Sequence, residues 1–140
     1  MTEYNTTVDI PAPPARVWAV MADVERWPEW TPTVTRIERL DSGPLAVGSR
    51  ARIQQPKLPT AIWEVSELVA GRGFTWITRS PGVRVIATHS VEPSPQGTRA
   101  MLSVRFAGLL GGLVARFTRE LNARYLSLEA QGLRERSLRG

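Results

Sequence analysis

The sequence of 140 residues contains no cysteine and only one histidine, His89. The absence of cysteine excludes disulfide frameworks, thiolate metal sites and cysteine nucleophiles. A single histidine excludes zinc sites with two imidazole ligands, and we expect neither metal nor other cofactor. No apolar run approaches the roughly 18 residues of a membrane span, and the first residues lack the basic, then apolar pattern of a signal peptide. We therefore expect a cytoplasmic protein without stable membrane insertion.

Lysine is nearly absent as well, because all but one of the 18 basic residues are arginine. The net charge of +5 raises the question of a nucleic acid or membrane surface as partner. Most arginines, however, stand singly between apolar residues, and only Arg134, Arg136 and Arg139 are concentrated. We interpret the arginines as a solvated surface and expect no nucleic-acid partner. An interaction module that binds acidic partners through its arginines is the alternative.

Length and composition favour a single domain over residues 1–140. Hydrophobic residues make up 42% and charged residues 22%, which excludes wholesale disorder. A chain of this length can bury a core without disulfides or metals. We expect residues 134–140 to form a loose tail. A monomer and a homodimer are both compatible with the sequence.

Apolar periodicity predicts a strand followed by two short helices at the N-terminus. Residues 4–10 alternate as a strand does, and the prolines of residues 11–14 end it. Pro14 suits the first turn of a helix, and a second short helix is expected around Trp27. The apolar stripe of the first helix consists of Val17, Val20, Met21 and Val24.

The rest of the chain predicts an antiparallel sheet and one long helix. Extended runs separated by Gly and Pro are typical of hairpins, and we expect them near residues 33–40, 49–55, 60–69, 73–79, 83–92 and 98–107. After Gly108 the apolar period becomes three or four, which predicts a C-terminal helix with the stripe Leu110, Val114, Phe117, Leu121, Tyr125 and Leu128. This helix must cover one face of the sheet. A helix about 10 Å wide cannot fill a broad concave sheet, so we expect a cavity between them.

Two adjacent N-terminal motifs resemble the signature of a known superfamily. They are Pro11-Ala12-Pro13-Pro14-Ala15-Arg16-Val17-Trp18 and Asp23-Val24-Glu25-Arg26-Trp27-Pro28-Glu29-Trp30, with further matches at Gly48, Trp63-Glu64-Val65 and Gly97-Thr98-Arg99. From about residue 4 to residue 133 the chain resembles the START-like (SRPBCC) superfamily, in particular its polyketide cyclase/dehydrase and lipid-transport branch. The resemblance implies an α+β helix-grip fold: a seven-stranded antiparallel sheet around a long C-terminal helix, with two short helices after the first strand. It also implies a cavity for hydrophobic ligands such as lipids, sterols or polyketides, and some members are cyclases or dehydratases.

His89 is the principal candidate polar group of the expected cavity. It shares one face of its strand with Val83, Val85 and Ala87, which should point inward. There it could bond a ligand carbonyl, act as acid or base in a cyclase or dehydratase, or simply be a partly buried histidine bonded to a neighbour. No serine elbow or phosphate-binding loop is present, so we expect ligand binding rather than covalent catalysis.

The other candidate ligand-binding residues are aromatic, apolar or amide side chains at expected inward positions. Trp63 and Trp76 either contact a flat ligand or fill the interior, and an interior filled by tryptophans leaves no usable cavity. The full set of candidates is Trp30, Gln55, Trp63, Trp76, His89, Phe117, Leu121 and Tyr125. The sequence thus predicts a protein that binds a hydrophobic or aromatic small molecule, lipid or polyketide-like.

Overall fold

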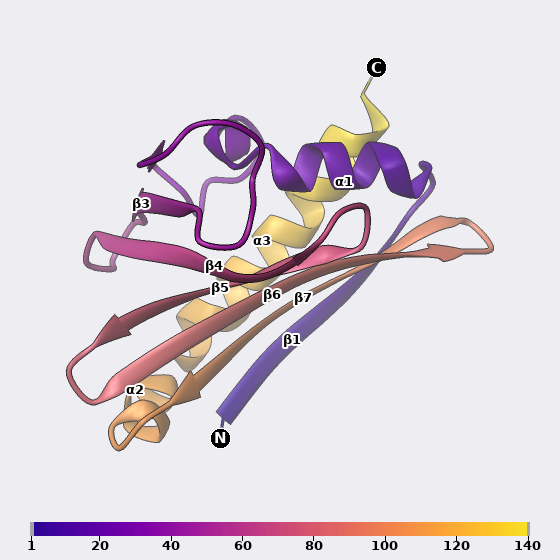
Figure 1. Ribbon diagram of the computed structural model, residues 1–140. Coiled ribbons are helices and arrows are strands. Elements are labelled where there is room, and N and C mark those ends of the chain that lie inside the picture. The colour runs from indigo at the N-terminus through magenta and orange to yellow at the C-terminus, as the bar shows by residue number, and fades with distance from the viewer. Residues whose placement is uncertain (1, 140) are drawn as a thin grey trace.

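The computed structural model describes residues 2–139, which form a seven-stranded antiparallel sheet and a set of helices on one of its faces (Figure 1). The strand order is β1-β7-β6-β5-β4-β3-β2, so every neighbouring pair except β1–β7 is also consecutive in the sequence. The strands are β1 (Thr2–Ile10), β2 (Arg36–Arg39), β3 (Arg50–Gln54), β4 (Ala61–Val69), β5 (Gly73–Ser80), β6 (Val83–Ser94) and β7 (Gly97–Ala107). The helices are α1 (Pro14–Ala22), the 3-10 helix η1 (Val24–Glu29), α2 (Gly111–Phe117) and α3 (Arg119–Leu138). The predicted helix-grip architecture is confirmed.

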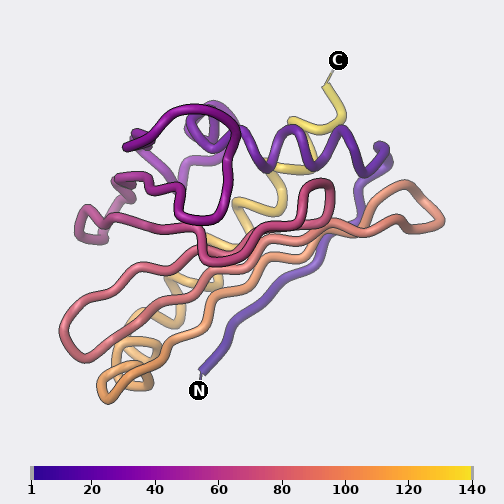
Figure 2. The backbone as a smooth tube through the Cα atoms, viewed as in Figure 1, coloured from indigo at the N-terminus to yellow at the C-terminus, as the bar shows by residue number. Residues whose placement is uncertain are grey.

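The long helix α3 runs along the face that the sheet curves around (Figure 2). At one end α1 packs beside the C-terminal part of α3, and at the other end α2 packs against β6, β7 and β1. Figure 1 shows α2 next to the turn between β5 and β6, far from α1 and the C-terminus. The space between sheet and α3 is therefore bounded by a short helix at each end.

The side-chain alternation of β7 gives the sheet its inner and outer faces. Ala100, Leu102 and Phe106 are buried, whereas Arg99 and Met101 are exposed. This period of two follows from the pleat of a strand, in which successive side chains point to opposite faces. Because β6 pairs with β7 along almost its whole length, the same alternation carries over to the neighbouring strand.

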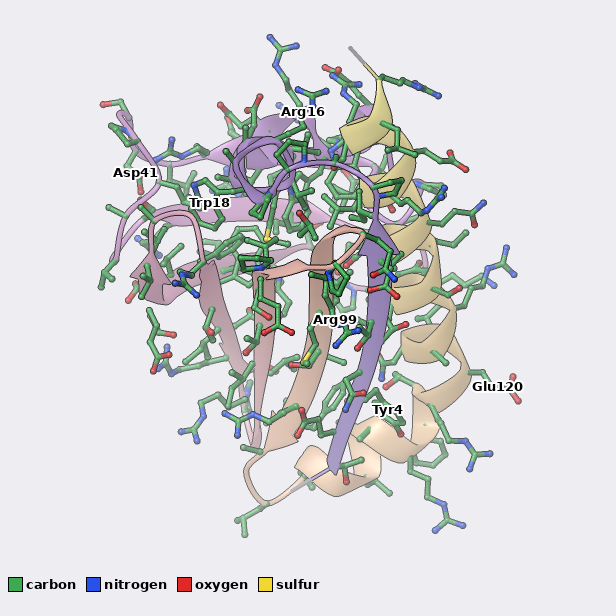
Figure 3. All side chains as sticks on the ribbon, turned by 90° about the vertical axis from the view of Figure 1, so that its right-hand side faces the viewer. Tyr4, Arg16, Trp18, Asp41, Arg99 and Glu120 are labelled. Atoms are coloured by element: carbon green, nitrogen blue, oxygen red, sulfur yellow. The ribbon has the colours of Figure 1, made fainter. Side chains whose placement is uncertain are left out.

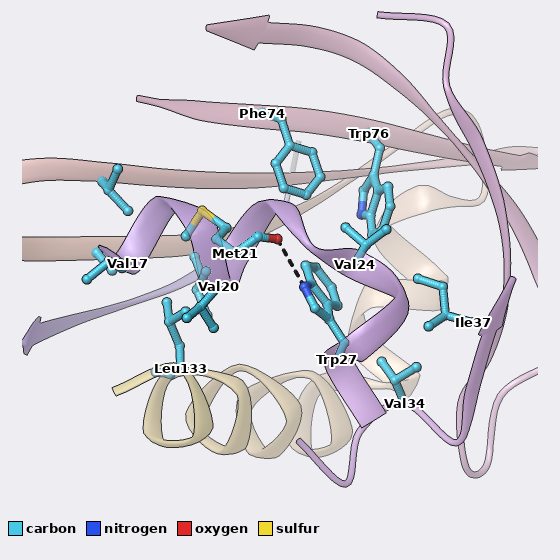
Figure 4. Packing of buried hydrophobic residues seen from close by; sticks show 14 of the residues in the cluster. Val17, Val20, Met21, Val24, Trp27, Val34, Ile37, Phe74, Trp76 and Leu133 are labelled. Carbon is cyan, nitrogen blue, oxygen red and sulfur yellow. Dashed lines mark hydrogen bonds between the residues drawn. The ribbon is translucent and has the colours of Figure 1, made fainter. Parts of the chain in front are cut away.

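The tightest apolar packing lies where α1 and η1 meet β5 and α3 (Figure 4). Val17, Val20 and Met21 form the buried face of α1, in the stripe that the sequence predicts. Trp27 of η1 packs in the same cluster, and its Nε1 donates a hydrogen bond to the carbonyl oxygen of Met21 at 3.0 Å. Leu133 extends the cluster onto α3. These contacts hold one end of α3 firmly against the rest of the fold.

The helix α3 continues to Leu138, so the prediction of a loose tail over residues 134–140 is wrong as far as the structure describes the chain; Gly140 lies outside the described residues. The Arg16 guanidinium of α1 donates to three carbonyl oxygens at this end, those of Arg136, Ser137 and Arg139. Figure 3 shows Arg16 beside the C-terminal end of α3. A cation there satisfies free carbonyls and complements the helix dipole.

The single C-terminal helix that we expected is divided at Thr118 into α2 and α3. Thr118 has φ −105° and ψ 13°, and its hydroxyl donates to a carbonyl oxygen of the preceding turn at 2.7 Å. After this break the inner face of α3 includes Asn122, Tyr125, Leu126 and Glu129. Relative to the predicted stripe, which used Leu121, the helix is turned by about one residue.

The second strand is shorter than predicted: β2 covers Arg36–Arg39, which is only part of residues 33–40. Thr31 and Thr33, which precede it, are buried, and their side chains are bonded outside the sheet. Thr31 and Thr33 join their hydroxyls at 3.0 Å, and Thr33 Oγ1 donates to Oε1 of Glu129 on α3 at 3.0 Å. These bonds hold Thr33 against the helix, and the first backbone bond to β3 is the one that Thr35 N–H donates to the Gln54 carbonyl oxygen.

Gly132 provides a test of the packing between α3 and η1. A Cβ at this position would lie only 2.0 Å from the carbonyl oxygen of Trp30, whereas a Cβ at Gly112 of α2 meets nothing within 4 Å. We expect Gly132→Ala to lower the free energy of unfolding by about 1–3 kcal/mol through overpacking. Gly112→Ala should be neutral or stabilise by up to about 1 kcal/mol. Urea denaturation of both variants is the measurement, and equal stability of the two would contradict the close packing.

Candidate ligand-binding cavity

A cavity of about 660 Å³ lies between the sheet and α3. Its walls come from the inner faces of β4 to β7, the loop between β3 and β4, and the helices η1, α2 and α3. Most of the lining is apolar, with a small number of polar side chains among it. The apolar and aromatic residues of the lining include Trp27, Val34, Ile53, Trp63, Trp76, Val83, Val85, Ala87, Leu102, Val104, Phe106, Val114 and Leu126.

Three indoles line one wall of the cavity. The ring centroids of Trp63 and Trp76 are 6.0 Å apart, and those of Trp27 and Trp76 are 5.4 Å apart. The tilted arrangement is favourable for aromatic pairs, and it presents a broad apolar surface to the cavity. The tryptophans therefore form part of the wall, and they leave the space between sheet and helix open.

His89 faces the cavity from β6 and is itself buried. The Phe74 ring stacks on the imidazole with centroids 4.5 Å apart, and Nδ1 lies 3.4 Å from the Phe74 carbonyl oxygen. Burial lowers the pKa of His89 to about 4, so the ring is neutral near pH 7. A carbonyl oxygen only accepts, which assigns the proton to Nδ1 and leaves the lone pair on Nε2. His89 can thus accept a hydrogen bond or a proton, but at neutral pH it is no strong proton donor.

Glu129 of α3 is the second titratable group of the cavity, and sequence reasoning missed it. Its carboxyl oxygen Oε1 accepts a hydrogen bond from the Thr33 hydroxyl. The same Thr33 hydroxyl is also bonded to the hydroxyl of Thr31. Burial raises the pKa of Glu129 to about 7, with the Thr33 hydrogen bond opposing the rise. The carboxyl faces the cavity rather than bulk solvent, which explains why the residue is accessible in part and yet strongly desolvated.

Two further polar side chains of the helices, Thr118 and Asn122, also face the cavity. Asn122 Nδ2 donates to Thr118 Oγ1 at 2.9 Å. Near the loop between β3 and β4, the Tyr125 hydroxyl donates to the carbonyl oxygen of Pro56, and partial burial raises the pKa of that hydroxyl. Polar side chains thus line the cavity from the helices, and from the sheet they include Thr78, His89 and Ser103.

Five of the eight residues proposed from the sequence line this cavity, namely Gln55, Trp63, Trp76, His89 and Tyr125. The other three, Trp30, Phe117 and Leu121, do not. Trp30 lies at a separate, polar depression together with Gly132 and Arg136 of α3. Phe117 is 81% exposed on α2.

The break at Thr118 explains why Phe117 and Leu121 were misplaced. A single regular helix would carry both on the inner side, but α2 and α3 turn neighbouring positions inward instead. The signal for Glu129 was present in the sequence. It follows Leu126 by three residues and precedes Leu133 by four, which is the spacing of one helix face.

Neither a metal site nor a membrane span is evident in the part of the chain that the structure describes. Within residues 2–139, no cluster of three or more carboxylate or imidazole side chains is placed to hold a metal ion. Over the same residues, no helix is both long and apolar enough to cross a membrane.

The fold and the cavity together define a helix-grip protein with an internal, largely apolar chamber. The family model described as polyketide cyclase / dehydrase and lipid transport matches residues 1–137, and the chain belongs to this family. The resemblance drawn from the N-terminal motifs is confirmed. Membership supports a ligand-binding or cyclase-type role without specifying the ligand or a reaction. No curated protein matches the sequence significantly.

Several solved structures share the fold at low sequence identity. TTHA0849 from Thermus thermophilus superimposes with a TM-score of 0.77 and 22% identity, covering 98% of this chain and 97% of that one. The Zhui aromatase/cyclase from a Streptomyces species gives 0.76 and 17%, covering 97% and 93%. XoxI from Bacillus cereus gives 0.75 and 17%, covering 99% and 96%. At these identities the likeness is one of fold.

The opposite pKa shifts of Glu129 and His89 predict a compensated pH dependence of stability. The folded Glu129 keeps its proton up to about pH 7 instead of 4.5, so its contribution is full below 4.5 and is lost as the pH rises through about 7. The folded His89 releases its proton at about 4 instead of 6.5, so its contribution is full above 6.5 and is lost as the pH falls through about 4. The two contributions oppose each other between 4.5 and 6.5.

Single substitutions should uncover each contribution. In Glu129→Gln we expect the free energy of unfolding to rise by up to about 3 kcal/mol between pH 4 and 6.5, owing to His89. In His89→Gln it should fall by a similar amount between pH 4.5 and 7. Urea denaturation across this range gives the slopes relative to the unsubstituted protein. If both variants keep its slope, the two groups are not desolvated as described.

Proposed function

We propose that the protein binds a hydrophobic or aromatic small molecule, lipid or polyketide-like, in the cavity between the sheet and α3. The observation that supports this most is the cavity itself, because about 660 Å³ lies within the range of small-molecule sites. Its predominantly apolar surface, with polar groups placed among the apolar ones, matches the usual design of such a site. Family membership agrees with this assignment at the level of class.

Binding in this cavity would depend mainly on removing apolar surface from water, at about 25 cal/mol per Å². The indoles of Trp63 and Trp76 offer flat surface to a ring or a hydrocarbon chain. His89 Nε2 suits a ligand hydroxyl, and the Glu129 carboxyl, when protonated, suits a carbonyl oxygen. A neutral ligand with one or two oxygen functions therefore fits this lining best.

A cyclase or dehydratase activity is the second candidate, and the pair of shifted groups favours it. Glu129, with a pKa of about 7, can hold a proton for donation at neutral pH. His89, with a pKa of about 4, is a neutral acceptor in the same cavity. One acid and one base with pKa values displaced in opposite directions are the components of acid–base chemistry. In this role His89 would act as base and Glu129 as acid.

A substitution that fills the cavity tests the binding site. Ala87 lines the cavity from β6, and Ala87→Phe would project a ring into the open space. We expect it to weaken binding of the fluorescent probe anilinonaphthalene sulfonate by about tenfold or more. The added ring would occupy the volume that the probe needs, and the closely packed residues around the cavity cannot move aside to make room. Met101→Phe on the exposed face of β7 is the matched control and should leave the affinity unchanged. Equal affinities in the two variants would place the probe outside the cavity.

The catalytic alternative is distinguished by separating binding from turnover. With a linear polyketide analogue as substrate, His89→Ala should abolish product formation and change affinity for the same analogue by no more than a few-fold. For a carrier, the unsubstituted protein binds the analogue and releases it unchanged. Chromatography of the reaction mixture and fluorescence titration supply the two readouts.

A further inference from the structure

The outer side of α2 carries an exposed apolar surface that the fold leaves uncovered. It consists of Leu109, Leu110, Leu113 and Phe117, which we call the α2 patch, and their exposed fractions are 99%, 47%, 53% and 81%. These are four of the ten large hydrophobic side chains that are exposed within the described residues. Gathered exposed apolar side chains of this kind mark a surface that another body covers.

The geometry of α2 separates this patch from the cavity. Leu113 and Phe117 are four residues apart and lie on one side of α2, and Leu109 and Leu110 lie in the turn that leads into it. Ala115, on the opposite side, is buried, and Val114 lines the cavity. A helix that meets solvent on its outer side is expected to be polar there. Here both sides are apolar, and packing within the chain accounts for only one of them.

The turn between β5 and β6 extends the patch with cations. A Cβ on Gly82, in this turn, would lie 2.7 Å from a methyl group of Leu110, so turn and patch are in contact. Arg79 and Arg84 flank the turn and stand directly opposite each other across the strands. Like charges in this register are unfavourable within a protein. A negatively charged partner would relieve their repulsion.

Four arginines gather at this end of the molecule, and like several arginines elsewhere in the described residues they are not in ion pairs. Arg79, Arg84, Arg116 and Arg119 are exposed, and none of them is in an ion pair with a carboxylate of the described residues. The arginines that do form ion pairs there are Arg26, Arg39, Arg50, Arg52, Arg99 and Arg136. The acidic residue next to Arg119 is Glu120, at the start of α3 (Figure 3). The end of the molecule that carries the α2 patch is therefore basic.

From the apolar patch and its arginines we propose that the α2 patch docks the protein onto a bilayer surface rich in anionic phospholipid. Apolar side chains suit the acyl boundary, and flanking arginines suit the phosphate layer. A second copy of this chain fits less well, because two basic ends would face each other. Arg79 and Val114 also line the cavity, so docking brings the cavity wall to the membrane surface. The proposal stands whether or not the cavity binds a lipid.

Flotation with lipid vesicles tests the proposal. The full chain should bind vesicles that contain phosphatidylglycerol and should bind pure phosphatidylcholine vesicles far more weakly. The double variant Leu113→Ser/Phe117→Ser should lose about tenfold or more in affinity for the anionic vesicles, because two exposed apolar anchors are removed. Arg84→Gln/Arg119→Gln should lose about fivefold per arginine, and salt should weaken binding of the unsubstituted protein.

The chain offers a matched control at its opposite end. Val47 and Val69 are both 63% exposed and lie away from α2, so Val47→Ser/Val69→Ser removes comparable apolar surface and should leave vesicle binding unchanged. Circular dichroism checks that all variants are folded, and probe binding in the cavity reports separately on the proposed function. The proposal is overturned if the α2 variant floats as well as the control, or if binding ignores lipid charge. It is also overturned if the protein does not bind vesicles and sedimentation instead finds a dimer that is lost when Phe117 is substituted.

Discussion

The cavity depends on what α3 presents to the concave sheet. Helix and sheet are held apart by the packing at one end, where Trp27 and Leu133 join η1, α1 and α3 in a dense core. Beyond that core the inner face of the helix carries Asn122, Tyr125, Leu126 and Glu129, which leave the chamber open. Close packing is the rule in protein interiors. The open volume is thus an exception to close packing, and it lies between the concave sheet and one face of α3.

The polar groups of the chamber are arranged so that it is nearly uncharged. Burial keeps His89 neutral and pushes the ionisation of Glu129 toward neutral pH. The arginines, by contrast, lie outside, apart from Arg79 in the lining. An interior with so little charge favours neutral apolar ligands, and charged ones would carry a desolvation cost. The same two groups are those that acid–base catalysis would use.

Much of the fold was predictable because apolar and polar residues alternate along its strands and because glycine and proline mark its turns. The alternation from Ala100 to Phe106 assigned the inner face of β7 correctly, and with it the general position of His89 on the paired strand. The end of the chain was not predictable in the same way. Its order depends on Arg16, which bonds the last carbonyls of α3 from more than a hundred residues away in the sequence. The residues near the C-terminus do not by themselves predict such a long-range contact.

The site was predictable on the sheet side and less so on the helix side. Strand positions have two possible directions, so Trp63 and Trp76 were assigned to the inner face by alternation alone. A helix has a continuous range of directions, and a break at Thr118 shifted the expected stripe by one residue. That shift replaced Leu121 by Asn122 and Leu128 by Glu129 on the inner face. Where a helix side chain points was decided by tertiary packing.

The most direct test of this account is a crystal structure of the protein soaked with bromonaphthalene, using the anomalous signal of bromine. The account predicts a peak inside the chamber, between the Trp63 and Trp76 indoles and Leu126. A chamber closed by rearranged side chains, with bromine found only at the molecular surface, would contradict it.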